Sequence, residues 1–295
     1  MAFNWLDKIE YPFSSNYFEI NNVRMHYIDE GEGETLLFVH GTPSWSFDFR
    51  NIIKDLKDKY RCIAIDHIGF GLSDKPEKYD YSTKNHSNNL EKFITEKALE
   101  NITLIVHDFG GPIGLNYAIK YPEKIKNLVI LNYWLWSSET DPEYVKLKKL
   151  LKSPLLPLLY KYLNFSPKFI LPQSFGEHKL TRRILKQYTQ PFSTPKERYG
   201  ALAFAYSLLN DQKWFEELWE KKSFISEKPC LFIWGMKDPV LKPYNLEKFQ
   251  KGFKNSISVK LEKSGHFPQE EEPLEVSKAI EFFLTQKLLK EETRI

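Results

Sequence analysis

Three ionisable residues of the sequence, Asp108, Asp238 and His266, each lie in a turn that follows an apolar run. A short apolar run bounded by turn residues is typical of a buried strand. The carboxyl ends of parallel strands meet at one edge of a sheet, so these side chains are expected to lie close together. Their order along the chain is that of a nucleophile, an orienting acid and a histidine base. Such a set carries out displacement through a covalent intermediate, followed by hydrolysis.

Asp108 lies at the apex of a predicted strand–turn–helix unit. The run TLIVH at residues 103–107 precedes it, and a helical pattern follows Gly110 and Gly111. A turn of this kind holds one reactive side chain out over the end of a sheet. The two glycines are expected because strand and helix approach closely there, and a Cβ would collide. The apex residue is a carboxylate, so a serine esterase is excluded.

Strand-like and helix-like segments alternate on both sides of this turn. The predicted strands are residues 17–20, 23–28, 35–39, 61–65, 103–107, 126–131, 230–234 and 257–261, and the predicted helices begin near residue 47 or span 83–99, 111–120, 244–253 and 273–289. Short links between alternating strands and helices predict an α/β fold, with a mostly parallel sheet and helices on both faces. The first two strands flank Asn21 and Asn22, a pair that is typical of a tight hairpin.

The alternation stops between residues 133 and 222. This segment has no strand-like run, and seven prolines divide it into short helical stretches with leucine-rich faces. It is too apolar to be a disordered linker. We therefore predict a core domain of residues 1–132 and 223–295, with an inserted helical cap at residues 133–222.

The composition limits the classes of partner. The 295 residues carry 42 Lys and Arg against 39 Asp and Glu, a net charge of +3. This balance argues against nucleic acid or a membrane as a partner, and no apolar window approaches the ~20 residues of a transmembrane helix. Cys62 and Cys230 lie in separate apolar runs and are expected to be buried thiols. No metal or cofactor motif is present, and no secretory signal pattern begins the chain, so a cytoplasmic enzyme without a cofactor is expected.

Several stretches together resemble a known superfamily. They are residues 40–47, 66–76, 103–112, 235–238 and 265–267. Over nearly its whole length the chain resembles the α/β-hydrolases, and within them the aspartate-nucleophile branch of haloalkane dehalogenases and epoxide hydrolases. The dehalogenase pattern is the nearest. Residues 60–76 are also similar to β-lactone decarboxylases of long-chain olefin synthesis.

The resemblance implies a two-step hydrolysis of a small to medium apolar substrate by water. Asp108 would attack an electrophilic carbon and form an ester, and His266 would draw a proton from the water that hydrolyses this ester. Asp238 would orient His266 and stabilise the imidazolium. The backbone N–H groups of Thr42 and Phe109 would form the oxyanion hole.

The sequence is compatible with more than one leaving group. Haloalkane dehalogenases hold the departing halide with a Trp after the nucleophile and a further Asn or Trp donor, whereas this chain has Phe109 and Thr42 there. Trp45, Trp134 and Trp136 are the candidate substitutes in substrate binding, and packing is the alternative role for each.

Epoxide hydrolases instead protonate a ring oxygen with cap tyrosines. The predicted cap contains Tyr144, Tyr160, Tyr162, Tyr188, Tyr199 and Tyr206. Indole N–H groups beside Asp108 would favour a halide, and two phenols would favour an epoxide. Dehalogenase-like activity is the favoured prediction, with epoxide hydrolase, β-lactone decarboxylase and a non-catalytic ligand sensor as alternatives. The oligomeric state is not predicted.

Overall fold

The computed structural model describes residues 3–292. Eight strands form one sheet in the order β1-β2-β4-β3-β5-β6-β7-β8. The strands are β1 (Asn16–Ile20), β2 (Val23–Glu30), β3 (Thr35–Val39), β4 (Arg61–Ile65), β5 (Ile102–His107), β6 (Ile125–Leu131), β7 (Cys230–Gly235) and β8 (Ser256–Leu261). The pairs from β4 to β8 are parallel, while β1 with β2 and β2 with β4 are antiparallel. The predicted mostly parallel sheet is confirmed.

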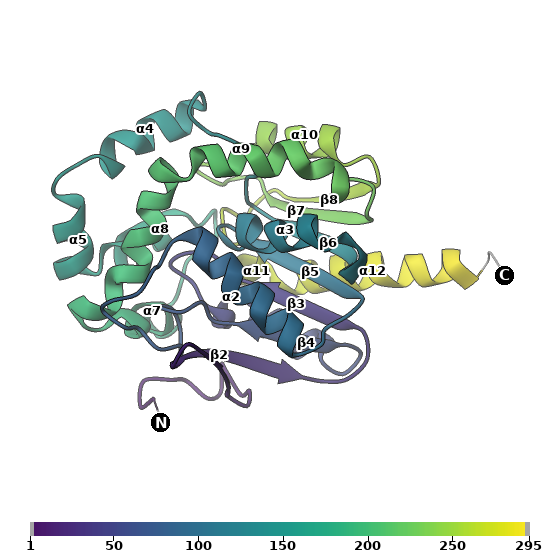
Figure 1. Cartoon of the computed structure of the whole chain (residues 1–295), viewed down its shortest axis with the longest axis horizontal. Coiled ribbons are helices and arrows are strands. Elements are labelled where there is room, and N and C mark those ends of the chain that lie inside the picture. The colour runs from purple at the N-terminus through teal and green to yellow at the C-terminus, as the bar shows by residue number, and fades with distance from the viewer. Residues whose placement is uncertain (1–2, 293–295) are drawn as a thin grey trace.

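Helices cover both faces of the sheet (Figure 1). Alternate residues of a strand point to opposite faces. Leu37 and Val39 of β3 pack in one core cluster with α2 (Thr83–Glu96), α3 (Gly110–Lys120) and α10 (Pro243–Gly252). Leu36 and Phe38 pack in the other cluster with α1 (Arg50–Leu56) and α12 (Pro273–Glu292). The short α11 (Pro268–Glu271) lies between β8 and α12 in the chain. The central strands are therefore buried on both sides, which explains their continuous apolar sequence.

Residues with a left-handed backbone conformation form the β1–β2 turn and end helix α2. Asn21 and Asn22 have φ of +50° and +64° in the β1–β2 hairpin, as a two-residue turn between twisted strands requires. Helix α2 ends at Glu96 rather than at the predicted Leu99. Ala98 adopts a left-handed conformation, φ +49°, which terminates the helix.

Between β6 and β7 the described chain contains helices and no strand. We call residues 133–222 the helical insertion. Its elements are α4 (Pro142–Leu151), α5 (Leu156–Leu163), the π-helical turn η3 (Ser166–Ile170), α6 (Leu171–Gln173), α7 (Arg182–Thr189), the 3₁₀ turns η4 (Gln190–Phe192) and η5 (Pro195–Arg198), α8 (Tyr199–Asn210) and α9 (Gln212–Glu220), with a further 3₁₀ turn, η6 (Lys221–Phe224), at its end. Six of its seven prolines occupy the first or second position of a helix or helical turn, where the missing N–H is not needed. Helices α4, α5, α7 and α8 lie at the left of Figure 1, away from the C-terminus.

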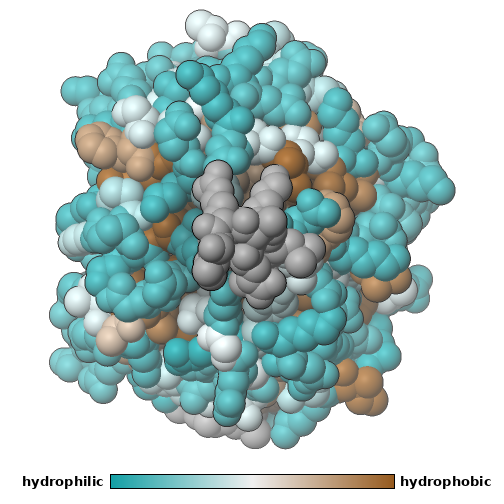
Figure 2. Space-filling view, turned by 90° about the vertical axis from the view of Figure 1, so that its right-hand side faces the viewer, coloured by the Kyte–Doolittle hydropathy of each residue, from teal (hydrophilic) through white to brown (hydrophobic). Residues whose placement is uncertain are grey.

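The opposite side of the molecule, from which α12 projects, has a mainly hydrophilic surface with separate hydrophobic patches (Figure 2). Among the described residues, no helix is both long and apolar enough to cross a membrane. Cys62 and Cys230 are free and buried, as predicted.

Candidate active site

The turn at Asp108 has the predicted geometry. Strand β5 ends at His107, Asp108 adopts a left-handed φ of +50°, and α3 begins at Gly110. A Cβ added to Gly110 would lie 2.0 Å from the carbonyl oxygen of Val39, and one added to Gly111 would lie 1.8 Å from the ring of Tyr133. A left-handed conformation at a non-glycine residue costs about 1–2 kcal/mol. The surrounding structure therefore holds Asp108 in a strained conformation, as functional turns often do.

The fold brings Asp108, Asp238 and His266 together. The Nε2 atom of His266 lies 3.3 Å from Oδ2 of Asp108, and its Nδ1 atom lies 2.6 Å from Oδ2 of Asp238. These residues follow β5, β7 and β8, whose carboxyl ends meet at one edge of the sheet. The imidazole thus bridges two carboxylates, as a nucleophile–histidine–acid set requires.

Asp238 is held in place by hydrogen bonds to both of its oxygens. Its Oδ1 accepts from the N–H groups of Val240 (2.8 Å) and Leu241 (2.9 Å), and its Oδ2 accepts from Nδ2 of Asn132 (2.9 Å). Asn132 also exchanges hydrogen bonds with the backbone of Gly235, which ties β6 to β7. Asn132 was not among the residues predicted from the sequence. Its position directly after an apolar strand, like that of Asp108, was the available signal.

The charges of this group are strongly coupled. Burial disfavours the protonated form of His266, yet the neighbouring carboxylates of Asp238 and Asp108 prevail and raise its pKa to about 10. Burial also disfavours the charge on Asp108, but its hydrogen bond to His266 lowers the pKa below the ordinary value. The pKa of Asp238 is likewise lowered against burial by the charge of His266. In the resting site an imidazolium therefore lies between two carboxylates.

One oxygen of Asp108 is already bound by backbone. The N–H of Thr42 donates to Oδ1 of Asp108 at 2.8 Å. The loop can approach this closely because a Cβ on Gly41 would lie 2.2 Å from Oδ1 of Asp108. Phe109, predicted as the second oxyanion donor, stands at the N-terminal end of α3, where a helix presents free N–H groups.

A cavity of about 150 Å³ adjoins the three residues. Its lining is mainly apolar and comes from both the core and the helical insertion. The insertion contributes Trp134, Ser138, Asp141, Tyr144, Leu147, Leu151, Tyr160, Ser166, Ile170, Ser174, Ala205 and Leu208. Engineered cavities of about this volume hold a molecule the size of benzene. Within residues 3–292, no cluster of His, Cys, Asp or Glu is arranged to hold a metal ion.

The three tryptophans predicted to bind substrate have different environments. Trp134 lines the cavity, and its indole packs edge-on against Phe109 with ring centroids 5.2 Å apart. Trp45 is instead buried in the core, where its Nε1 donates to the carbonyl of Gln187. Trp136 packs against Trp219 and is absent from the cavity lining. Trp45 and Trp136 therefore lie in the hydrophobic core and outside the cavity lining, and substrate binding by the three tryptophans stays a prediction.

Three residues in the cavity lining have a buried polar group without a hydrogen-bond partner among the described residues. These groups are the indole N–H of Trp134, the hydroxyl of Thr42 and the side-chain amide nitrogen of Asn245. Buried polar groups are nearly always paired, so unpaired donors on residues that line a cavity are candidates for binding a ligand.

Of the six tyrosines considered, Tyr144 and Tyr160 line the cavity. The hydroxyl of Tyr144 already donates to the carbonyl of Leu208 at 2.6 Å. Burial, together with the charge of Asp108, raises the pKa of Tyr160 to about 12, so its phenol stays protonated. Tyr188 donates to Glu270 in the core, whereas Tyr162 and Tyr199 are exposed. Of these two cavity tyrosines, Tyr160 is therefore the one whose hydroxyl has no hydrogen bond to the described backbone.

The sheet, the strained turn after β5, and the acid and histidine after β7 and β8 together define an α/β-hydrolase with a carboxylate in the nucleophile position. Residues 34–273 match the sequence profile of the alpha/beta hydrolase fold family. The chain belongs to this family.

The chain is similar to proteins that are named for three different activities. The chain is 34% identical to a cis-3-alkyl-4-alkyloxetan-2-one decarboxylase of Shewanella oneidensis, over 93% of this chain and 89% of that protein. It is 31% identical to haloalkane dehalogenase 2 of Mycobacterium tuberculosis, over 92% and 94%. It is 27% identical to epoxide hydrolase 1 of Caenorhabditis elegans, over 92% and 70%. The crystal structure of haloalkane dehalogenase DatA from Agrobacterium tumefaciens C58 superposes with a TM-score of 0.82 at 25% identity, over 92% and 96%.

Proposed function

We propose that this protein is a haloalkane dehalogenase-like hydrolase, which converts a small haloalkane and water into an alcohol, a halide ion and a proton. One observation carries this proposal: Asp108 and Trp134, whose indole N–H has no hydrogen-bond partner among the described residues, line the same small, mainly apolar cavity. The carboxylate supplies the nucleophile, and the indole supplies a donor for the anion that leaves.

In the first step, Oδ2 of Asp108 attacks the carbon that carries the halogen. The new carbon–oxygen bond forms as the carbon–halogen bond breaks, and the halide takes the bonding electrons. Oδ1 accepts the N–H of Thr42 at 2.8 Å, whereas Oδ2 has only the longer 3.3 Å contact with Nε2 of His266, so Oδ2 is the less tightly held oxygen. The halide is received by Nε1–H of Trp134 and the hydroxyl of Thr42, which replace the donor that Phe109 lacks.

In the second step, water hydrolyses the ester. Esterification removes the charge of Asp108, one of the two carboxylates that raise the pKa of His266, so the pKa falls and the imidazolium releases its proton to solvent. His266, oriented by Asp238, then takes a proton from water as the water oxygen attacks the ester carbonyl. The N–H groups of Thr42 and Phe109 stabilise the resulting oxyanion. Collapse of the intermediate breaks the bond between the carbonyl carbon and the alkoxy oxygen. The second proton of the attacking water passes to this oxygen, so the alcohol leaves and the carboxylate of Asp108 and the imidazolium of His266 are regenerated.

The helical insertion acts as a cap in this proposal, because it supplies about half of the cavity lining. The cavity of about 150 Å³ is large enough for a short haloalkane.

A β-lactone decarboxylase is the second candidate, favoured by the 34% identity to the Shewanella oneidensis enzyme. An epoxide hydrolase has less support, since Tyr144 is committed to a backbone carbonyl and Tyr160 alone is left to protonate a ring oxygen. A ligand sensor would have no need of the complete set Asp108, Asp238 and His266.

Bromide release from 1-bromobutane and 1,2-dibromoethane by purified protein tests the proposal, with Asp108→Asn as the inactive control. Parallel incubations with a cis-3,4-dialkyl β-lactone and with a terminal epoxide, assayed for carbon dioxide and diol, separate the candidates. Bromide release that Asp108→Asn abolishes is the expected result. Bromide at the level of the buffer blank, with either other product formed, would overturn the dehalogenase assignment.

A further inference from the structure

The stretch of the helical insertion from α4 to η3 exposes a high concentration of large apolar side chains. Six of the fourteen such side chains in the described part of the chain lie within residues 145–169, and they are 44–62% exposed. We call this surface the 145–169 face. It comprises Val145, Leu155, Leu158, Tyr162, Leu163 and Phe169. Scattered exposed apolar residues are ordinary on a protein surface, but a local cluster of them marks an interaction site.

The same segment carries a strong positive charge. Residues 144–176 contain six lysines and no Asp or Glu, although the whole chain has a net charge of only +3. Lys146 and Lys148 pair with Glu143 and Glu139, which precede this stretch. Lys149, Lys152 and Lys161 are exposed and form no ion pair with any described residue. The chain as a whole therefore has nearly balanced charges, whereas this segment is locally basic as well as apolar.

Charge and composition decide which partner fits the 145–169 face. Protein–protein interfaces are depleted in lysine, and a two-fold dimer through this face would place the same lysines opposite one another. At an anionic lipid surface, in contrast, apolar side chains enter the boundary between headgroups and acyl chains while lysines reach the phosphates.

We propose that the 145–169 face binds the surface of an anionic lipid bilayer. The inner sides of the same helices line the cavity through Leu147, Leu151 and Tyr160. A protein bound in this way would hold its cavity next to the lipid, in which apolar substrates concentrate. The mainly hydrophilic surface on the side of α12, shown in Figure 2, would face the solvent.

Flotation of the full chain with lipid vesicles tests this proposal and needs no turnover, so it is independent of the proposed function. Vesicles of phosphatidylglycerol mixed with phosphatidylcholine should bind the protein at low salt, and vesicles of phosphatidylcholine alone should bind it much more weakly. The triple variant Lys149→Gln/Lys152→Gln/Lys161→Gln should lose about fivefold in partitioning for each lysine replaced. The double variant Leu158→Ser/Tyr162→Ser should also bind less.

The matched control is Lys251→Gln/Lys254→Gln/Lys260→Gln, which removes the same charge from exposed positions of the segment 251–260. It should bind vesicles nearly as well as the wild type. Equal losses in the two triple variants, or binding that does not depend on anionic lipid, would overturn the proposal. A dimer in sedimentation velocity that Leu158→Ser dissociates would assign the face to a second copy instead. All replaced side chains are exposed, so unchanged near-ultraviolet circular dichroism is expected.

Discussion

At the scale of single residues, His266 has different surroundings in the two proposed steps. Two carboxylates flank it in the resting site, where its pKa is about 10, and one remains once Asp108 is esterified. The first step needs no base because Asp108 is already ionised, whereas the second step needs neutral His266. Changes at His266 should therefore separate displacement from hydrolysis.

Replacing His266 with Gln should trap the ester. Displacement by Asp108 remains possible, but hydrolysis loses its base, so turnover should fall by about 10²- to 10⁴-fold. Mass spectrometry of the peptide that contains Asp108, after incubation with a substrate, should show the mass of the added alkyl group. The Asp108→Asn/His266→Gln double variant should show none. An unmodified Asp108 peptide in the single variant, with a confirmed substrate, would contradict the ester mechanism.

Lowering the pH should have a similar effect in the wild type. The lowered pKa of Asp108 keeps it ionised in mildly acidic solution, so displacement continues. Below the pKa of His266 in the ester, the imidazole is protonated and cannot accept a proton from water. Rapid quenching at about pH 5, below the ordinary histidine value of about 6.5, should therefore find more ester than quenching at about pH 8.5. An ester fraction that does not change with pH would argue against His266 as the base.

The indole N–H of Trp134 should affect the rate of the first step only, because it stabilises the halide that leaves in that step. Trp134→Phe removes this donor and keeps an aromatic ring beside Phe109 and Phe215. Loss of one such donor costs roughly 3 kcal/mol, or about 10²-fold in rate. Single-turnover bromide release should slow by that factor. Trp136→Phe, at a position outside the cavity lining, is the matched control and should remain close to the wild type. Similar rates in the two variants would remove Trp134 from the leaving-group site.

At the scale of elements, the helical insertion is fastened to the loop that carries His266. The N–H of His266 donates to the carbonyl of Ser174 at 2.8 Å, and the N–H of Glu177 donates to the carbonyl of Lys263 at 2.8 Å. Glu271 accepts from the N–H groups of Gly176 and Gly265. His266 and this part of the helical insertion are thus positioned by one set of hydrogen bonds.

Substituting Gly176 with Ala should disturb this junction. The added Cβ would lie 2.1 Å from the carbonyl oxygen of Lys263, so one of the two backbone segments must move. A displacement of about 1 Å can cost 10²-fold in rate, and a loss of about this size in kcat is expected from steady-state kinetics. Ser174→Ala keeps the carbonyl that His266 uses and should retain most of the activity. Wild-type kinetics in Gly176→Ala would show that the junction tolerates movement.

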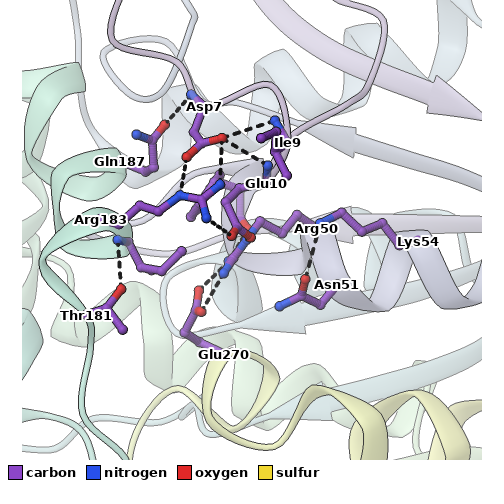
Figure 3. Close-up of polar contacts among 12 residues, drawn as sticks. Asp7, Ile9, Glu10, Arg50, Asn51, Lys54, Thr181, Arg183, Gln187 and Glu270 are labelled. Carbon is purple, nitrogen blue, oxygen red and sulfur yellow. Dashed lines mark hydrogen bonds and ion pairs between the residues drawn. The ribbon is translucent and has the colours of Figure 1, made fainter.

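At the scale of the whole molecule, a polar network joins the N-terminal segment, the core and the helical insertion (Figure 3). Arg50 donates two hydrogen bonds to Glu270, and Tyr188 of α7 donates to the same carboxylate. Near the surface, Arg183 of α7 binds Asp7. The network is buried at Arg50 and Glu270, with side chains 3% and 6% exposed, and open to solvent at Arg183.

The buried and exposed ends of this network should contribute very differently to stability. Glu270→Ala leaves the buried guanidinium of Arg50 without its principal partner and should lower the free energy of unfolding by about 3–5 kcal/mol. Arg183→Ala breaks an exposed pair and should cost about 0–1 kcal/mol. Guanidinium chloride titrations of the two variants measure both changes. Equal losses would mean that burial does not determine the strength of these pairs.

The sequence allowed good prediction of the sheet and of three polar side chains that meet at its edge. Apolar runs, the Asn21–Asn22 turn and the glycines after Asp108 act locally, so their signals can be read without knowledge of distant contacts. Asp108, Asp238 and His266 were found for the same reason, since each follows a strand and parallel strands share one edge. The locations of the tryptophan side chains were less predictable. An indole suits a core or a cavity equally well, and nothing near Trp45 or Trp136 in the sequence distinguishes the two.

The sequence by itself determined that a carboxylate stands at a sharp turn after a buried strand, and that an acid and a histidine follow later strands of the same sheet. Only the tertiary structure decided that Trp134 rather than Trp45 lines the cavity, that Asn132 holds Asp238, and that apolar side chains within residues 145–169 are left exposed. The physical reason is the range of the interactions. Backbone conformation is governed by neighbouring residues, whereas the partner of a side chain is set by packing between segments far apart in the chain.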